Sequence, residues 1–309
     1  MLTATTFDPR SPVLRPPDRG SGMPSSVAVE DVLALRSALA GVAAGRAEVV
    51  QAVDCAGGGA RSVGLLDELA RTMELRTRRP VVRIGRDPDP GRSVDRPPVW
   101  TGRDALTGWS ESMVRSDGAG GSYLASSHWP CGVDLDVEGA QVALLASVVN
   151  PVACVVGPRT SAAEVVALCE RLDPRRDPGR LTFVARMGAS VVAERLPPLV
   201  RAVAAAGHPV IWVTDPLGGN SVVAPGGVRT RFVVDVVREV LSFQDAVRGG
   251  GGVPGGVRLE CTPDDVAECV QDRWLISRLS DNCTTPCDPR LAPGQAVAVV
   301  GVWRAEVAR

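Results

Sequence analysis

Thiol, carboxylate and guanidinium side chains stand next to short apolar segments at several places in this chain. Asp54 and Cys55 follow one segment, Arg186 follows another, Glu260 ends a third and Asp288 precedes a fourth. A thiolate and carboxylates are common ligands of divalent metals, and arginine is suited to binding phosphate or carboxylate groups. These residue types indicate a metal beside a site for an anionic substrate.

The same residues also have purely structural interpretations. A buried cysteine such as Cys55 is often a small core hydrophobe, and the pairs Asp215-Pro216 and Asp288-Pro289 are of a type common in turns. An arginine at the end of a strand can serve only as an ion-pair partner. The residue types alone leave both interpretations open.

The composition excludes several kinds of chemistry. All 34 basic residues are arginines, so neither a Schiff-base lysine nor a P-loop lysine is available. The two histidines, His128 and His208, are too few to favour a Ser-His-Asp triad or a His-rich metal site. The net charge of -1 gives no indication of binding to nucleic acid or to a membrane surface.

Apolar, β-branched segments alternate with helical patterns along most of the chain. Helices are expected over residues 27–45, 161–172, 189–206, 230–247 and 264–270, the second with a capping box from Ser161 to Glu164. The eight candidate strands are Glu48–Val53, Val81–Gly85, Tyr123–His128, Ala153–Val156, Leu181–Arg186, Pro209–Thr214, Gly256–Cys261 and Ala296–Val302. Eight such units predict an α/β fold, a (β/α)8 TIM barrel with its functional residues at the C-terminal strand ends. An open doubly wound sheet is the alternative.

Two regions do not follow this alternation. Residues 1–26 are rich in Pro, Ser, Gly and Arg and lack periodicity, which predicts a disordered tail before a single barrel domain over residues 27–309. Residues 87–121 have a similar composition and are expected to form a long loop over one mouth of the barrel.

A series of short motifs resembles the type II 3-deoxy-D-arabino-heptulosonate-7-phosphate (DAHP) synthases and follows the order of that family. The resemblance covers most of the chain after the tail, and the chain is shortened after Arg103-Asp104. The matching motifs include Asp54-Cys55-Ala56, Val156-Gly157-Pro158, Arg186-Met187-Gly188, Asp215-Pro216, Gly219-Asn220, Thr230-Arg231, Glu268-Cys269 and Cys287-Asp288-Pro289-Arg290-Leu291.

This resemblance implies a transferase that condenses phosphoenolpyruvate with erythrose 4-phosphate on a divalent metal, with Zn, Mn or Co as candidates. Three of the family's metal ligands map by motif to Cys55, Glu260 and Asp288.

The resemblance also implies a set of substrate contacts. The substrate-binding candidates are Arg83, Arg92, Ser93, Arg186 and Arg229. Of these, Arg83 and Arg186 are also catalytic candidates, together with Asn220.

Several positions depart from the family pattern. The family's fourth metal ligand is the His of a His-Gly-Asn motif, which here reads Gly218-Gly219-Asn220. Its phosphoenolpyruvate-binding Lys before Val-Gly-Pro is Val155, a second Lys aligns with Pro90, and its Gly-Glu-Arg segment falls near Cys131-Gly132-Val133. Losing one charge-assisted contact to a buried anion costs roughly 1.5–3 kcal/mol, so ordinary phosphoenolpyruvate binding is expected to be impaired.

Three hypotheses follow. The first, which these departures favour, is a repurposed enzyme of secondary metabolism that performs a metal-assisted condensation, acyl transfer or carbon transfer on a less anionic substrate. The second is a genuine DAHP synthase in which other arginines, such as Arg86 or Arg229, compensate. The third is a non-catalytic homologue that binds a ligand or partner.

The expected partner is a small-molecule substrate, without nucleic acid or membrane. Eight scattered cysteines and no apolar run of about 18 residues predict a cytoplasmic protein with reduced thiols. Because barrels commonly pair, a homodimer is a further expectation.

Overall fold

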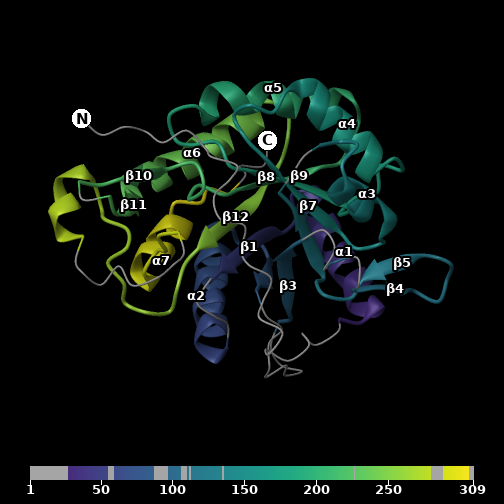
Figure 1. Ribbon diagram of the computed structural model, residues 1–309, viewed down its shortest axis with the longest axis horizontal. Helices are drawn as coiled ribbons and strands as arrows, with labels where there is room; N and C mark the ends of the chain where they lie inside the picture. Colours follow the sequence, from purple (N-terminus) through teal and green to yellow (C-terminus); the bar gives the residue numbers. More distant parts are fainter. Residues whose placement is uncertain are drawn as a thin grey trace.

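Eight parallel strands close into a barrel in the computed structural model of this chain (Figure 1). The structure describes residues 27–54, 59–86, 97–105, 110, 113–133, 136–225, 227–279 and 288–305. In spatial order the barrel strands are β1 (Glu48–Val53), β12 (Pro254–Glu260), β9 (Ile211–Thr214), β8 (Leu181–Ala185), β7 (Val152–Val156), β6 (Trp129–Gly132), β3 (Val99–Asp104) and β2 (Val81–Gly85). The predicted (β/α)8 barrel is therefore confirmed.

Helices surround the barrel and bury the outer faces of its strands. They are α2 (Ala60–Thr77), α3 (Ala140–Ser147), α4 (Ala162–Leu172), α5 (Val192–Ala205), α6 (Val233–Gly249) and α7 (Pro293–Gly301). Figure 1 shows α3, α4 and α5 arching over one side, with α2 and α7 on another. Apolar side chains of these helices and strands form one continuous cluster, and burial of apolar area at about 25 cal/mol per Å² stabilises this layer.

The helix α1 (Val29–Ala43) closes the end of the barrel opposite the candidate site. Its buried Leu35 and Leu39 belong to the same cluster as Val49 and Ile211, which lie at the N-terminal ends of their strands. The barrel interior is thus filled by side chains, as is usual for this fold. The open end is the C-terminal mouth.

Side-chain alternation determines which residues face the lumen. Val184 and Val213 belong to the interior cluster. Because alternate residues of a strand share a face, Arg186 and Asp215, two positions further on, point toward the mouth from β8 and β9. The same alternation puts Arg258 and Glu260 together on one face of β12.

The sequence prediction was wrong for two strands and one helix. The segment Ala296–Val302 lies mostly in the helix α7, which begins at Pro293 and has the Ala292 N–H bonded to Gln295 Oε1 at 3.1 Å. The segment Tyr123–His128 overlaps β5 (Ser122–Leu124), which pairs with β4 (Val114–Ser116) outside the barrel. The expected helix over residues 264–270 does not form. The capping box of α4, by contrast, is confirmed.

The barrel strand β3 lies within the segment that the sequence predicted as a loop. Its Gly102 is packed so closely that a Cβ atom would lie 2.5 Å from Ile84 Cγ2 and 2.7 Å from Gln51 Nε2. Only glycine fits against these neighbours, and it weakens the strand pattern in the sequence. The predicted tail over residues 1–26 lies outside the described residues.

Two smaller elements complete the mouth. The strands β10 (Ser221–Val223) and β11 (Arg229–Arg231) form an antiparallel hairpin after β9, and a 3-10 helix, η2, spans Arg273–Arg278 after β12. The hairpin brings Arg229 and Arg231 toward the end of β12.

Candidate active site

Two arginines share one buried carboxylate at the C-terminal mouth. Arg186 donates from Nε and Nη2 to Asp215 Oδ2, at 3.0 and 2.8 Å. Arg258 Nε lies 4.0 Å from the same oxygen, and the Asp215 side chain is 1% exposed. Burial opposes ionisation of Asp215, but Arg186 and Arg258 outweigh it and lower its pKa. The carboxylate is therefore charged at neutral pH.

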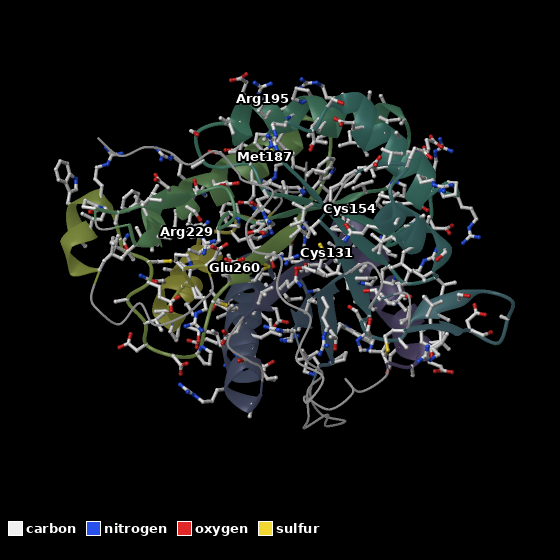
Figure 2. All side chains as sticks on the ribbon, viewed as in Figure 1. Cys131, Cys154, Met187, Arg195, Arg229 and Glu260 are labelled. Atoms are coloured by element: carbon white, nitrogen blue, oxygen red, sulfur yellow. The ribbon has the colours of Figure 1, made fainter. Side chains whose placement is uncertain are left out.

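Arg258 extends from β12 across the lumen to the opposite strands. Its Nη1 donates to Cys131 Sγ at 3.3 Å, and its Nη2 donates to Asp104 Oδ1 at 3.2 Å. In Figure 2 the labels of Cys131 and Glu260 mark the β6 and β12 sides of this mouth. Burial raises the pKa of the Cys131 thiol to about 11, so it is a neutral neighbour and not a nucleophilic thiolate.

A second group of charges joins β12, β11 and the segment before α7. Arg231 Nη2 lies 2.8 Å from Glu260 Oε2 and 3.9 Å from Asp288 Oδ2. Arg229 Nη1 lies 2.7 Å from Asp288 Oδ1. Figure 2 labels Arg229 and Glu260, which belong to this group. Two of the three metal-ligand candidates, Glu260 and Asp288, are thus brought together by the fold, each with an arginine partner.

The candidate Asn220 holds the loops after β8 and β9 together. Its Oδ1 accepts the N–H of Ala189 at 3.0 Å, and its Nδ2 donates to Glu239 Oε2 at 2.5 Å and to the Pro216 carbonyl at 2.6 Å. Glu239 also accepts the Gly188 N–H at 3.0 Å, and burial raises the pKa of Glu239 to about 7. The side-chain bonds of Asn220 are those of a positioning residue.

Arg83 is not brought to the mouth. Val82 and Ile84 face the lumen, so Arg83 faces outward toward α2, where it lies 3.1 Å from Glu74 Oε1 and 3.5 Å from Asp67 Oδ1. This placement does not support its predicted catalytic and substrate-binding roles. Arg86, at the end of β2, is the arginine of this segment that reaches the mouth.

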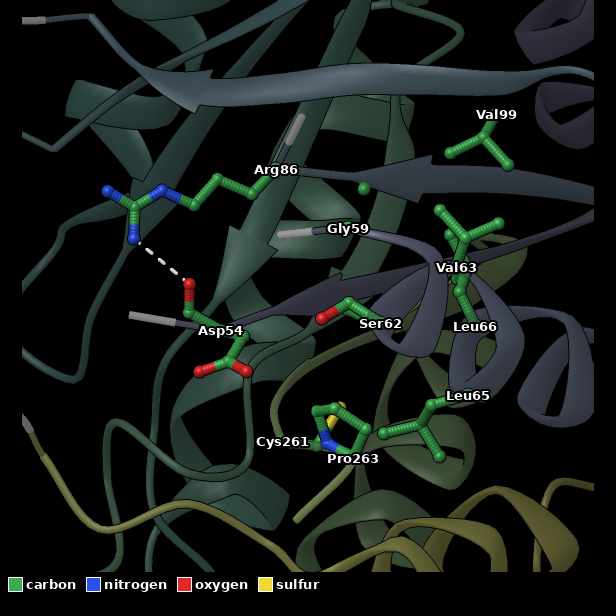
Figure 3. A pocket seen from close by; sticks show the side chains of 12 residues that line it. Asp54, Gly59, Ser62, Val63, Leu65, Leu66, Arg86, Val99, Cys261 and Pro263 are labelled. Carbon is green, nitrogen blue, oxygen red and sulfur yellow. Dashed lines mark hydrogen bonds between the residues drawn. The ribbon is translucent and has the colours of Figure 1, made fainter. Parts of the chain in front are cut away.

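Arg86 lines a pocket between the ends of β1 and β2 and the start of α2. Figure 3 shows its Nη1 donating to the Asp54 carbonyl, at 2.9 Å, with Ser62 and Cys261 also on the wall. The predicted metal ligand Cys55 follows Asp54 directly. Cys55, Arg92 and Ser93 lie outside the described residues, so their roles stay predictions.

The two main departures from the family pattern have a clear place in the structure. Val155 is buried on β7 and belongs to the lumen cluster. A Cβ atom on Gly218 would lie 2.2 Å from Arg186 Cδ, so the Arg186 side chain covers this glycine. A histidine at position 218 would require Arg186 to move.

Two of the three metal-ligand candidates, Glu260 and Asp288, lie among the described residues. Within the described ranges, no group of three His, Cys, Asp or Glu side chains is arranged to hold a metal ion. Glu260 and Asp288 supply carboxylates of the right chemistry, and Glu260 Oε2 is buried without a hydrogen-bond partner of suitable geometry in this part of the chain. With the thiolate of Cys55 the donor set fits a divalent cation.

A closed β/α barrel with arginines and carboxylates gathered at its C-terminal mouth has the architecture of a barrel enzyme. The chain belongs to the Class-II DAHP synthetase family, whose sequence model matches residues 81–302. It is therefore an enzyme of the DAHP synthase type, in a family that is generally metal-dependent.

Three curated relatives carry the same kind of name. A "Probable phospho-2-dehydro-3-deoxyheptonate aldolase" of Pseudomonas fluorescens is 40% identical over 91% of this chain and 89% of the relative. A "Phospho-2-dehydro-3-deoxyheptonate aldolase" of Streptomyces coelicolor is 39% identical over 62% of this chain and 44% of its own length. A "Phospho-2-dehydro-3-deoxyheptonate aldolase AroG" of Mycolicibacterium smegmatis is 36% identical over 67% of this chain and 47% of the relative.

Sequence reasoning missed Arg258, Asp104, Arg231 and Glu239 as parts of the site. Arg258 stands two positions before Glu260, and strand alternation alone would have put both at the mouth.

Among the described residues, no helix is long and apolar enough to cross a membrane.

Proposed function

We propose that this chain condenses phosphoenolpyruvate with erythrose 4-phosphate, the reaction that the resemblance to type II DAHP synthases implies. The supporting observation is the 40% identity to the P. fluorescens relative over nearly the full length of both proteins. The alignment spans 355 positions, more than the 309 residues of this chain, so this chain is shorter than that relative within the matched region. The comparison favours the genuine synthase over the repurposed enzyme.

The arginines of the mouth have the chemistry that these substrates need. Phosphoenolpyruvate and erythrose 4-phosphate carry phosphate or carboxylate groups, and guanidinium groups bind both through paired N–H donors. Arg186 and Arg258 are held by the carboxylates of Asp215 and Asp104, so their orientation is fixed before substrate arrives. Preorganised charges of this kind stabilise developing negative charge without reorganisation.

Cys55, Glu260 and Asp288 are the residues we propose to hold a divalent metal, with Zn, Mn and Co as candidates. When bound, such an ion polarises a substrate oxygen. Gly218 contributes no side chain to it. Arg231, which is 0% exposed at its side chain, supplies a permanent positive charge between the two carboxylates.

Removal of the Arg229 side chain is expected to strengthen metal binding. Arg229 pairs with Asp288 and must be displaced when Asp288 becomes a ligand. Both side chains are partly exposed, so Arg229→Ala should raise the affinity for Mn²⁺ by about two- to fivefold. Calorimetric titration of Mn²⁺ measures this change.

A matched control is Arg238→Ala, which removes another exposed arginine that pairs with Asp235 on α6. Its Mn²⁺ affinity should equal that of the wild type. Unchanged or weaker binding by Arg229→Ala would argue against Asp288 as a ligand.

A less anionic substrate is the second candidate, supported by Val155. This buried apolar side chain stands where the resemblance expects a cation. Incubation with phosphoenolpyruvate and erythrose 4-phosphate separates the two functions. The proposed reaction releases inorganic phosphate only when phosphoenolpyruvate and erythrose 4-phosphate are both present. If no phosphate is released at high enzyme concentration and saturating Mn²⁺, the proposed reaction is contradicted and a less anionic substrate is favoured.

A further inference from the structure

We propose that Arg258 is an anion-binding residue of the mouth, which exchanges its bond with Asp104 for a phosphate or carboxylate group of the substrate. That this substrate is phosphoenolpyruvate rests on the proposed function. The binding of a small anion by Arg258 does not depend on the proposed function. No motif of the sequence assigned any role to this residue.

The first argument is the place that Arg258 reaches. In the ring of eight strands, β12 and β6 are opposite, with three strands between them on either side. Arg258 begins on β12 and ends 3.3 Å from Cys131 on β6. Its guanidinium therefore crosses the lumen toward the side where β6 adjoins β7, the strand of Val155. It brings a positive charge to a wall that otherwise presents an apolar side chain.

The second argument is that the bonds of Arg258 are incomplete. Its Nε is buried and has no hydrogen-bond partner among the described residues, and one of its other two donors meets only a neutral thiol. Arg290, a structural arginine, differs. It donates to carboxylates from Nε, Nη1 and Nη2, at 3.1, 3.0 and 2.7 Å.

The third argument is charge. Two guanidinium groups, those of Arg186 and Arg258, stand around the single buried carboxylate of Asp215. The balancing charge is Asp104, whose side chain is 28% exposed and 3.2 Å from Arg258. A substrate anion can replace Asp104 beside Arg258 without leaving a buried charge unpaired, whereas it cannot replace Asp215 at so low a cost.

The test compares two variants that change anion affinity in opposite directions. Asp104→Asn frees Arg258 and should tighten binding of phosphoenolpyruvate about tenfold, whereas Arg258→Met should weaken it roughly 10- to 100-fold, as expected for one charge-assisted bond. Binding is measured by calorimetry with phosphoenolpyruvate and with inorganic phosphate. Arg180→Met is the matched control, because Arg180 is also buried but donates to backbone carbonyls of Leu145 and Leu172. Its anion affinity should not change.

The outcomes separate this inference from the proposed function. Suppose that the wild type binds phosphate but not phosphoenolpyruvate, and that Asp104→Asn tightens phosphate binding. The anion-binding role of Arg258 is then confirmed, whereas phosphoenolpyruvate as the substrate is contradicted. Equal or weaker binding of both anions by Asp104→Asn overturns the inference, as does unchanged affinity in a folded Arg258→Met protein. A wild type that binds neither anion overturns it as well. Because Arg258→Met can destabilise the barrel, the Asp104→Asn result decides in that case.

Discussion

The variant Arg186→Met is expected to lose roughly 10- to 100-fold in kcat/KM for phosphoenolpyruvate, the cost of one charge-assisted contact. Arg186 ends β8 at the mouth, and Asp215 fixes its guanidinium through two donors. The remaining donor, Nη1, has no hydrogen-bond partner within the described part of the chain and is available to a substrate anion. Steady-state rates of phosphate release over a range of phosphoenolpyruvate concentrations give the value.

Two further variants control for indirect effects of this change. Arg186→Met leaves Asp215 with less positive charge nearby, so the double variant Arg186→Met/Asp215→Asn should fold better than the single one and still show the loss. Arg195→Met removes an exposed arginine of the next helix, α5, and should behave as the wild type. A folded double variant with wild-type kcat/KM would contradict a substrate-binding role for Arg186.

The variant Arg290→Met is expected to lower the free energy of unfolding by about 3–5 kcal/mol, because it breaks a buried ion pair on one side. Arg290 donates to Glu268 through its backbone N–H, Nε and Nη2, and to Asp54 through Nη1. Glu268 is 0% exposed at its side chain and would lose its cationic partner at a buried position. Urea denaturation followed by circular dichroism measures the difference.

An exposed ion pair provides the comparison for this prediction. Arg61 lies 2.7 Å from Asp264, with side chains 71% and 53% exposed. Arg61→Met should therefore cost less than about 1 kcal/mol. The double variant Arg290→Met/Glu268→Gln should be more stable than Arg290→Met alone. A loss below about 1 kcal/mol for Arg290→Met would show that this cluster does not tie β1 to the segment before α7.

Most of the barrel was predictable because its strands are apolar and separated by clear helices. β7 and β8 are fully buried, and α4 begins with the capping box that Ser161 and Glu164 indicate. The errors arose where two signals conflict. The β-branched run of α7 is typical of a strand, yet Pro293 and Gln295 start a helix there. The strand β3 was hidden by the glycine that its packing requires.

The site was predictable residue by residue only in part. Motifs indicated Glu260, Asp288 and Arg186, and the fold brings all three to the mouth. The outward orientation of Arg83 was not predictable, because a motif position does not state which face of a strand a side chain occupies. Arg231 reaches Glu260 and Asp288 from the β10–β11 hairpin, and Asp104 reaches Arg258 from β3. These pairs join segments far apart in the sequence, so no local pattern could reveal them.

The most direct test of the proposed function is identification of the product that the wild-type protein forms. Purified enzyme is incubated with Mn²⁺, phosphoenolpyruvate and erythrose 4-phosphate, and the mixture is analysed by mass spectrometry. The proposed function predicts a seven-carbon keto acid phosphate, formed in equal amount to the inorganic phosphate released. Recovery of both substrates unchanged at enzyme concentrations comparable to theirs would contradict it.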